Sequence, residues 1–338
     1  MSDSIKLVIN GYEYSRFKSY NIKSDIYEAA DAFQVEAYQS DEFRPTEGMK
    51  FELYVNNELE HIGILDRVGR GYDSSGRFLS MSGRDVMGLI VDSCCEEFPT
   101  IQNNTIAKIA DRLLKNVPYI TGIEYDEAAK KRDSSKPFVQ IEPGQKIFDV
   151  LRDVAISRGL VFYATARGGL VFRKPRGKGK CSFSLIQKAG INSGIIKAEE
   201  VGDLTNRFSS YTVLAQEQGR DEGDPVEINA KATVVDDQFP FKGVLKKPFV
   251  EAVADDKESP AKLAKRYMEK NRMMANTVNY TVKGHSQNTQ NWAIDELVNV
   301  DDDKLGVHKQ LLVYARTFAG NSNQQITELK LGIPGMVE

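Results

Sequence analysis

The chain changes its structural pattern within residues 78–95, which read FLSMSGRDVMGLIVDSCC. Up to Met81 the apolar side chains alternate loosely, as in a strand, and Gly83 breaks this alternation. Apolar residues then take up a helical spacing, at Val86, Leu89 and Ile90. Because strand patterns precede this stretch and two well-signalled helices follow it, we expect a domain boundary here, with residues 1–93 as the first domain.

The first domain is expected to consist of short antiparallel strands joined by tight turns. Alternating side chains predict strands at residues 5–9, 12–14, 49–55 and 59–68. Asn10-Gly11 is the strongest hairpin signal in the sequence, and Asn56-Asn57 marks a second turn. Strands separated by turns at this interval are typical of a small barrel or sandwich.

Residues 94–180 are expected to form a small α+β domain. One helix is predicted between Asn104 and Pro118, where apolar residues recur every three or four positions. A second helix begins after residues 142–145 and ends at Gly159, with its predicted buried side at Ile147, Phe148, Leu151, Val154 and Ala155. A hairpin around residues 167–169 completes the unit.

The β pattern returns in residues 181–338. This second β domain contains an inserted helix near 260–274, which Ser259-Pro260 introduces. Its predicted apolar stripe, which we interpret as core packing, is Leu263, Ala264, Tyr267, Met268 and Met274. The expected fold class is therefore mainly β with an α+β insertion: two antiparallel β domains flank a small central α+β domain.

Composition excludes several classes of function. The 338 residues carry a formal net charge of -3, so no basic field favours nucleic acid, and the basic run at residues 173–180 is better interpreted as a solvated loop. Neither a signal sequence nor a membrane-length apolar run is present, so we expect folding in the cytoplasm. The odd cysteine count, Cys94, Cys95 and Cys181, favours reduced thiols.

No catalytic, cofactor-binding or metal site is predicted. His61, His285 and His308 lack zinc-site spacing. Residues 301–306 resemble a calcium loop only superficially, because leucines occupy ligand positions, and Gly177 and Gly179 lack the context of a dinucleotide fingerprint. A glycosidase carboxylate pair stays open, since carboxylates are numerous, for example Glu96, Glu97, Asp236 and Asp237.

Four ordered passages carry a resemblance to a known family. They are residues 82–85 with 89–93, residues 141–159, residues 207–211, and residues 291–302 with 311–313. In this order they resemble the baseplate hub proteins of Mu-like contractile-tailed phages and, more distantly, the hub part of type VI secretion spike proteins. Trp292 falls in the last passage, and we interpret it as a core plug before a strand.

The resemblance implies a homotrimeric hub in the tail baseplate of a virion assembled in the host cytoplasm, with two barrel-like antiparallel β domains per subunit around a channel. Because no catalytic constellation is found, we expect no enzymatic activity. The implied partners of the hub are the tail tube protein, the central spike protein and other baseplate proteins, with no cofactor, no membrane and no stable nucleic-acid binding, although DNA passes through the channel. Two alternatives stay open: a tail-associated protein that cleaves or binds peptidoglycan, the latter through residues 94–180, or the equivalent hub of a contractile bacteriocin or secretion machine.

Overall fold

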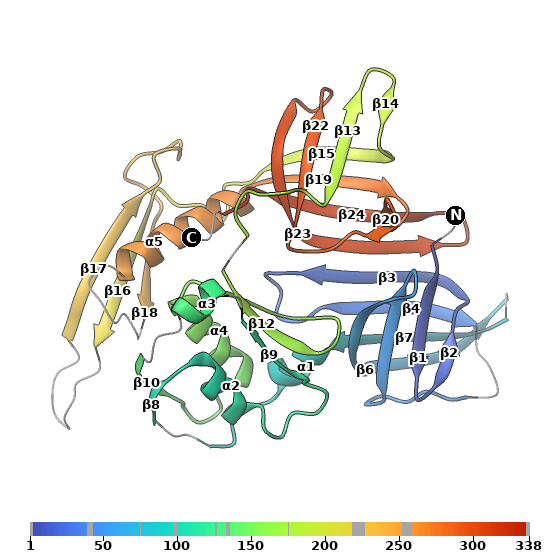
Figure 1. The fold of residues 1–338 in the computed structure, drawn as a ribbon, viewed down its shortest axis with the longest axis horizontal. Helices are drawn as coiled ribbons and strands as arrows, with labels where there is room; N and C mark the ends of the chain where they lie inside the picture. Colours follow the sequence, from blue (N-terminus) through green and yellow to red (C-terminus); the bar gives the residue numbers. More distant parts are fainter. Residues whose placement is uncertain are drawn as a thin grey trace.

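The computed structural model describes residues 3–38, 43–74, 76–97, 100–125, 127–132, 136–174, 176–217, 227–251 and 259–335. Two β lobes lie side by side, blue and orange-red in Figure 1, and two smaller units lie along one flank of them. We call these parts the first lobe (residues 3–85), the central unit (86–174), the second lobe (176–202 with 276–335) and the insertion unit (203–275).

The first lobe is an antiparallel sheet in the order β2-β1-β5-β6-β7-β4-β3. Its strands are β1 (Ile5–Ile9), β2 (Tyr12–Tyr14), β3 (Phe17–Asp25), β4 (Ala32–Tyr38), β5 (Lys50–Val55), β6 (Glu58–Asp73) and β7 (Gly76–Asp85). The predicted β1-β2 hairpin is confirmed, with positive φ at both turn residues, Asn10 and Gly11. Strand β3 was not predicted.

The second lobe has the order β14-β13-β22-β23-β24-β19-β15. Its strands are β13 (Phe183–Lys188), β14 (Ile191–Asn192), β15 (Ile195–Gly202), β19 (Asn276–Lys283), β22 (Glu296–Asp302), β23 (Val307–Asn321) and β24 (Gln325–Gly332), with the small hairpin β20 (Ser286–Gln287) and β21 (Gln290–Asn291). The pairs are antiparallel except β13-β22, which is parallel.

Strand β23 joins the two lobes into one sheet. Along one edge it pairs with β22 through residues 307–313 and then with β3 through residues 315–321. Buried side chains of both lobes accordingly form a single core cluster that extends from Ile5 to Leu331. The lobes therefore share backbone hydrogen bonds as well as apolar contacts.

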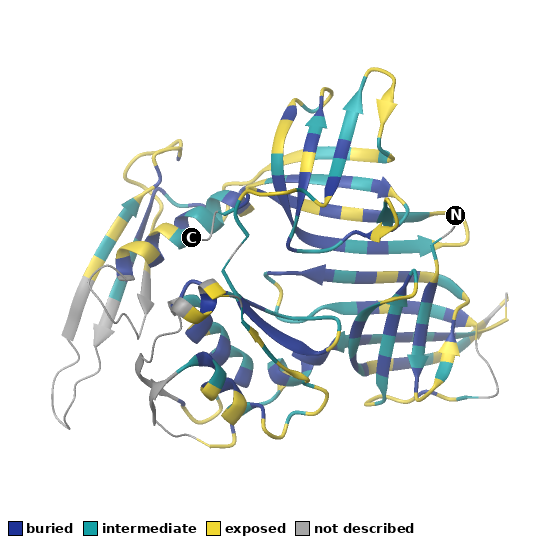
Figure 2. Ribbon diagram, viewed as in Figure 1, coloured by how far each residue is buried: buried dark blue, intermediate teal, exposed yellow. Residues whose placement is uncertain are grey.

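The expected antiparallel β character is confirmed, but the barrel-like description needs correction. The pairing of the described strands closes no ring, since β2, β14 and β15 each have one neighbour. A ring in the first lobe would need the free edge of β3, and that edge is already occupied by β23. Figure 2 shows buried and exposed residues alternating along these strands, as a half-buried sheet requires.

The central unit follows β7 without a linker. It contains α1 (Val86–Asp92), β8 (Thr100–Asn104), α2 (Ile106–Leu113), β9 (Gly122–Tyr125), α3 (Glu127–Arg132), β10 (Lys136–Gln140), α4 (Ile147–Ser157), β11 (Val161–Ala164) and β12 (Gly169–Arg173). The sequence suggested that the strand breaks at Gly83, but the structure has no break there. The strand continues to Asp85, whose carboxylate accepts a hydrogen bond from Met87 N and so caps α1.

Both predicted helices of the central unit form. Thr105 caps α2, which ends earlier than expected at Leu113, and the stop of α4 at Gly159 is confirmed by a φ of 68°. Leu151 is completely buried in a core that α1, α2 and α4 share with β11 and β12. This core is separate from that of the β lobes.

The insertion unit separates β15 from β19, two strands that pair with each other. It consists of β16 (Ser210–Glu217), β17 (Glu227–Val235), β18 (Lys246–Glu251) and α5 (Ser259–Met274). These strands were expected inside the second β domain but form their own three-stranded sheet. On α5 the predicted Met268 is buried, but the second buried methionine is Met273, whereas the predicted Met274 is 40% exposed. The domain limits at 93/94 and 180/181 stay a prediction.

Candidate functional site

The most unusual chemistry of the described chain lies where the two lobes meet, which we call the interlobe junction. It consists of the β3-β23 pairing and the polar side chains that both lobes bury beside it. Strand β23 is buried where it approaches the junction. Its residues 311–315 form a continuous apolar run, as expected of a strand covered on both faces. Arg316 follows that run directly and is only 3% exposed.

Arg316 is held by groups from three parts of the chain. Its Nη1 donates to Glu60 Oε2 at 2.9 Å and to the carbonyl of Trp292 at 2.7 Å, while Nη2 donates to Ser24 Oγ at 2.8 Å. The guanidinium also lies 3.9 Å from the centroid of the Phe318 ring. Because Ser24 and Glu60 belong to the first lobe and Arg316 to the second, one buried cation connects the two lobes.

A carboxyl group, Asp31, and a histidine, His61, lie near this cation in the first lobe. Asp31 accepts a hydrogen bond from Asp25 N at 2.9 Å, and its backbone carbonyl accepts one from Asp85 N at 3.0 Å. His61 Nδ1 lies 3.9 Å from Asp31 Oδ2. Burial raises the pKa of Asp31 to about 7, whereas burial together with the positive charge of Arg316 lowers the pKa of His61 to about 3.

Asp85 shares this environment at the end of β7. Burial and the neighbouring Asp31 raise the pKa of Asp85 well above its usual range. The same carboxylate caps α1, so the polar cluster reaches from the junction to the first helix of the central unit. The sequence passage SGRD thus contributes a helix cap and one of two neighbouring carboxyl groups, Asp85 beside Asp31.

A second set of polar contacts joins the lobes near the N-terminus. Asp3 accepts hydrogen bonds from Asn56 Nδ2 and from His285 N, both at 2.8 Å. Asn56 Nδ2 also donates to Asn291 Oδ1 at 2.9 Å, and the Tyr20 hydroxyl lies 2.7 Å from His285 Nε2. The junction is therefore fixed at two places along β3.

Trp292 closes the interior beside Arg316. Its side chain is 1% exposed and stacks on Phe183 with 4.4 Å between ring centroids. The predicted core plug is thus confirmed.

The basic run at residues 173–180 makes ion pairs within the chain. Arg173 contacts Asp295 at 2.6 Å, and Arg176 contacts Glu296 at 2.8 Å. These contacts fix the segment that leads from the central unit into the second lobe, so two of its cations are already neutralised by carboxylates.

The acidic turn at residues 301–306 brings Asp301, Asp303 and His308 within 4.8 Å of one another at the surface. Asp301 pairs with Lys188 at 2.5 Å and with His308 at 2.8 Å. Asp302 instead points inward and accepts hydrogen bonds from the backbone amides that follow it. An exposed turn with its own ion pairs explains this cluster, and we assign no metal to it.

The carboxylates left open as a glycosidase pair are engaged elsewhere. Burial acts to raise the pKa of Asp236, but hydrogen bonds from Arg207 and Arg272 outweigh it and lower the pKa. Glu97 pairs with Arg112 at 2.8 Å, which lowers its pKa as well. A general acid needs the opposite shift. Among the described residues, raised carboxyl pKa values lie at Asp25, Asp31, Asp85 and Asp295, none of which the sequence marked as a candidate acid.

Exposed apolar side chains gather at one end of the insertion unit, which we call the tip patch: Leu204, Val235, Phe241, Val244 and Leu245, each at least 40% exposed. Ser209 connects its backbone segments, because its amide donates to the Leu245 carbonyl and its own carbonyl accepts from Asp236 N. Apolar surface gathered in this way is typical of a contact with another protein. Among the described helices, none is long and apolar enough to span a membrane.

Comparison with known proteins gives a family for the first lobe. Residues 4–85 match the family model "Mu phage baseplate assembly protein GpP-like, N-terminal". The predicted resemblance to Mu-like baseplate proteins is confirmed. No curated protein sequence matches the chain.

The fold of the first lobe and of the remaining chain recurs in solved structures. A tail protein from Neisseria meningitidis is 24% identical with a TM-score of 0.84, and covers 99% of this chain and 98% of its own. The 43 kDa tail protein of prophage MuSo2 from Shewanella oneidensis is 23% identical with a TM-score of 0.82, covering 99% of both chains. A type VI secretion component from E. coli is 11% identical with a TM-score of 0.59, covering 97% of this chain and 76% of its own.

Proposed function

We propose that this chain is a structural component of a contractile phage-tail baseplate and forms its trimeric central hub. In this role three copies surround a channel and join the sixfold tail tube to the threefold spike. The observation that carries the proposal is the pairing of β23 with β3, which places two β lobes side by side in every subunit. The GpP-like match of residues 4–85 and the tail-protein folds support it.

A rigid pair of lobes in each subunit suits a contact between sixfold and threefold partners. Three copies carry six lobes, and a ring of six similar lobes meets a sixfold partner on one face while keeping threefold symmetry for another. This requires that the lobes of one subunit do not move independently. The shared core and the buried Arg316 contacts provide that rigidity.

The proposed partners follow from the same geometry. The two lobes meet the tail tube protein, the central spike protein and other baseplate proteins, and the tip patch contacts the next copy of the chain. Channel-facing side chains are mostly polar or charged, so that whatever crosses the hub, DNA included, binds to nothing on the way. The protein acts in the virion after assembly in the host cytoplasm.

The experiment that tests this function measures the mass of the purified protein in solution and images the particle. We expect a trimer with a threefold ring in projection. The double variant Phe241→Ser/Val244→Ser removes apolar surface from the tip patch and shifts the mass toward the monomer. Tyr72→Ser is the matched control, because Tyr72 is also exposed but lies in the first lobe.

Two results would contradict the hub. One is a monomer at high concentration that stays monomeric when tube and spike proteins are added. The other is an assembled particle in which residues 3–85 and 276–335 lie far apart.

A further inference from the structure

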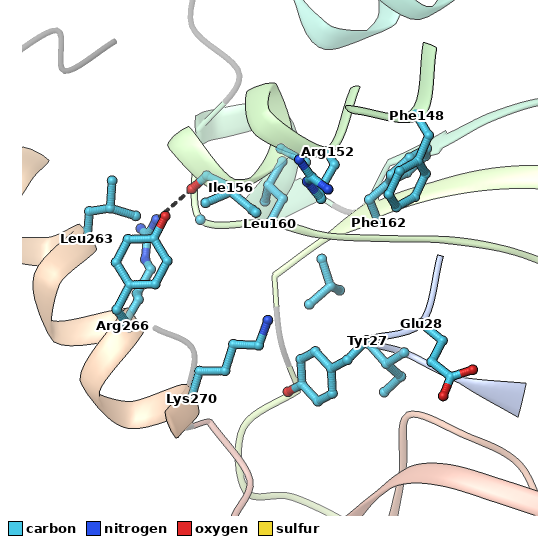
Figure 3. A pocket seen from close by; sticks show the side chains of 15 residues that line it. Tyr27, Glu28, Phe148, Arg152, Ile156, Leu160, Phe162, Leu263, Arg266 and Lys270 are labelled. Carbon is cyan, nitrogen blue, oxygen red and sulfur yellow. Dashed lines mark hydrogen bonds between the residues drawn. The ribbon is translucent and has the colours of Figure 1, made fainter. Parts of the chain in front are cut away.

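A cavity of about 130 Å³ lies where three parts of the chain meet. Tyr27 and Glu28 enter it from the turn after β3, Phe148 and Phe162 from the central unit, and Leu263 from α5 (Figure 3). Most of its wall is apolar. Its volume is below the roughly 300 Å³ of the smallest drug-sized pockets, so it suits a small ligand.

Three cations but only one carboxylate line this cavity. Arg152 pairs with Asp149 at 2.9 Å and with Asp153 at 2.9 Å on its own helix. Arg266 Nη1 donates to the Ile156 carbonyl at 3.1 Å. Glu28, the single acid of the wall, forms an ion pair with Lys23. The remaining cation is Lys270.

Lys270 extends from α5 into the cavity, and its Nζ lies 5.1 Å from the centroid of the Tyr27 ring (Figure 3). Within the described part of the chain this ammonium has that aromatic contact but no hydrogen bond or ion pair. Burial and the nearby positive charge of Arg152 lower the pKa of Lys270, and the more distant carboxylate of Asp25 offsets this only in part. A largely desolvated ammonium without a hydrogen-bonded anion is costly, so the site favours an occupant that brings a negative charge.

We propose that this cavity binds a small organic monocarboxylate with an apolar body. The carboxylate accepts a charge-assisted hydrogen bond from Lys270 Nζ, and the apolar body packs against Phe148, Phe162 and Leu263. A monoanion matches the single ammonium that projects into the cavity, since Arg152 pairs with acids of its own helix and Arg266 donates to the Ile156 carbonyl. The apolar wall accounts for a hydrophobic body and disfavours a more strongly hydrated anion such as inorganic phosphate.

Binding at this place has a structural consequence. The occupant contacts the turn after β3, helix α4 and helix α5, so it links the first lobe, the central unit and the insertion unit. A ligand that binds the folded state alone raises its stability in proportion to the occupancy. The melting temperature of the whole chain therefore reports on this site.

The test titrates the full chain with hexanoate by calorimetry and follows the melting temperature. We expect saturable binding with one site per chain and a melting temperature that rises with hexanoate concentration. Hexanol is the neutral probe of similar size and inorganic phosphate the anion without an apolar body, and both are expected to bind at least tenfold more weakly.

Lys270→Met keeps an unbranched apolar side chain, shorter by one atom, and removes its charge, and we expect at least a tenfold loss of hexanoate affinity. Lys265→Met is the matched control on the same helix, because Lys265 is 60% exposed and pairs with Glu269 instead. Circular dichroism checks that both variants fold. Equal binding of hexanol and hexanoate, unchanged affinity in Lys270→Met, or no saturation with the wild-type chain would each overturn the proposal.

Discussion

The guanidinium of Arg316 and the carboxylate of Glu60 form an ion pair of 2.9 Å that joins the two β lobes in the protein interior. Both side chains are largely buried, at 3% and 13% exposure. A pair of this kind contributes little net stability over an apolar pair of the same shape, but removing one partner leaves a charge without compensation.

Arg316→Met should lower the free energy of unfolding by about 3 to 5 kcal/mol, because Glu60 then stays buried without a cation. Urea unfolding measures this effect. Adding Glu60→Met should recover part of the loss. Arg84→Met is the control, since Arg84 pairs with Asp66 and Asp92 near the surface, where such contacts contribute about 1 kcal/mol or less. A similar loss in both single variants would refute the special role of the junction.

The acidic group beside this pair should give the protein a measurable pH dependence. Asp31 has a pKa raised to about 7 in the folded state, against roughly 3.9 in an unfolded chain. Between these values the folded state retains a proton that the unfolded state has released, so the contribution of Asp31 to stability falls as pH rises. Relative to wild type, Asp31→Asn should therefore gain stability from about pH 4 to 7, by on the order of 1.4 kcal/mol per pKa unit.

His61 should act with the opposite sign. Its folded pKa is lowered to about 3, against roughly 6.5 in an unfolded chain, so the unfolded state binds the extra proton in this range. The contribution of His61 to stability rises with pH, and His61→Gln should lose stability relative to wild type between about pH 3 and 6.5. Denaturant unfolding at a series of pH values checks both variants. Slopes of the same sign for the two would contradict the assignment.

The core of the central unit can be tested at one residue. Leu151→Ala should lower the free energy of unfolding by about 2 to 5 kcal/mol, because Leu151 is fully buried between α4 and its neighbours. Asp153→Ala, on the exposed side of the same helix, should change it by less than about 0.5 kcal/mol. Chemical denaturation followed by circular dichroism gives both values, and a cost below that level for Leu151 would place this face in solvent.

Gly83 should tolerate no side chain although its φ is not positive. An added Cβ would lie 2.5 Å from the Ile64 carbonyl oxygen and 3.0 Å from the Phe33 ring. We expect Gly83→Ala to cost about 1 to 3 kcal/mol through overpacking. Gly177→Ala is the control, since a Cβ there meets no atom within 4 Å. Thermal unfolding compares the two, and equal melting temperatures would contradict the close approach of β6 to β7.

The purified protein should show no turnover on peptidoglycan. Asp236 and Glu97 have lowered pKa values and arginine partners, which suits ion pairing and not proton donation. Release of soluble glycan fragments is the measurement. Activity that disappears on substitution of one carboxylate would overturn the non-enzymatic hub.

The sequence predicted those elements whose structure is determined by residues close together in the chain. The hairpin at Asn10-Gly11 and the stop of α4 at Gly159 need a positive φ, which these residue types supply at low cost. The choice of Met274 over Met273 failed because a helical spacing fixes a face only to within about one residue.

Contacts between distant segments could not be predicted in this way. In strand β3 the alternation of apolar and polar residues is weak, because two of its buried residues, Ser24 and Asp25, are polar. Its polar face is explained only by Arg316, which lies 292 residues away from Ser24 in the sequence. The raised pKa of Asp31 depends likewise on burial in the folded chain, which no local sequence pattern indicates.

The pairing of β23 with β3 also determines how the molecule responds to mechanical load. The two strands run antiparallel from Ala315 to Asn321, so a force along their length pulls on all the backbone hydrogen bonds of this segment at the same time. Bonds loaded together in shear resist far more than bonds opened one after another. We therefore expect the interlobe junction to be strongest along the direction of the strands, and a twist applied to one lobe to be transmitted directly to the other.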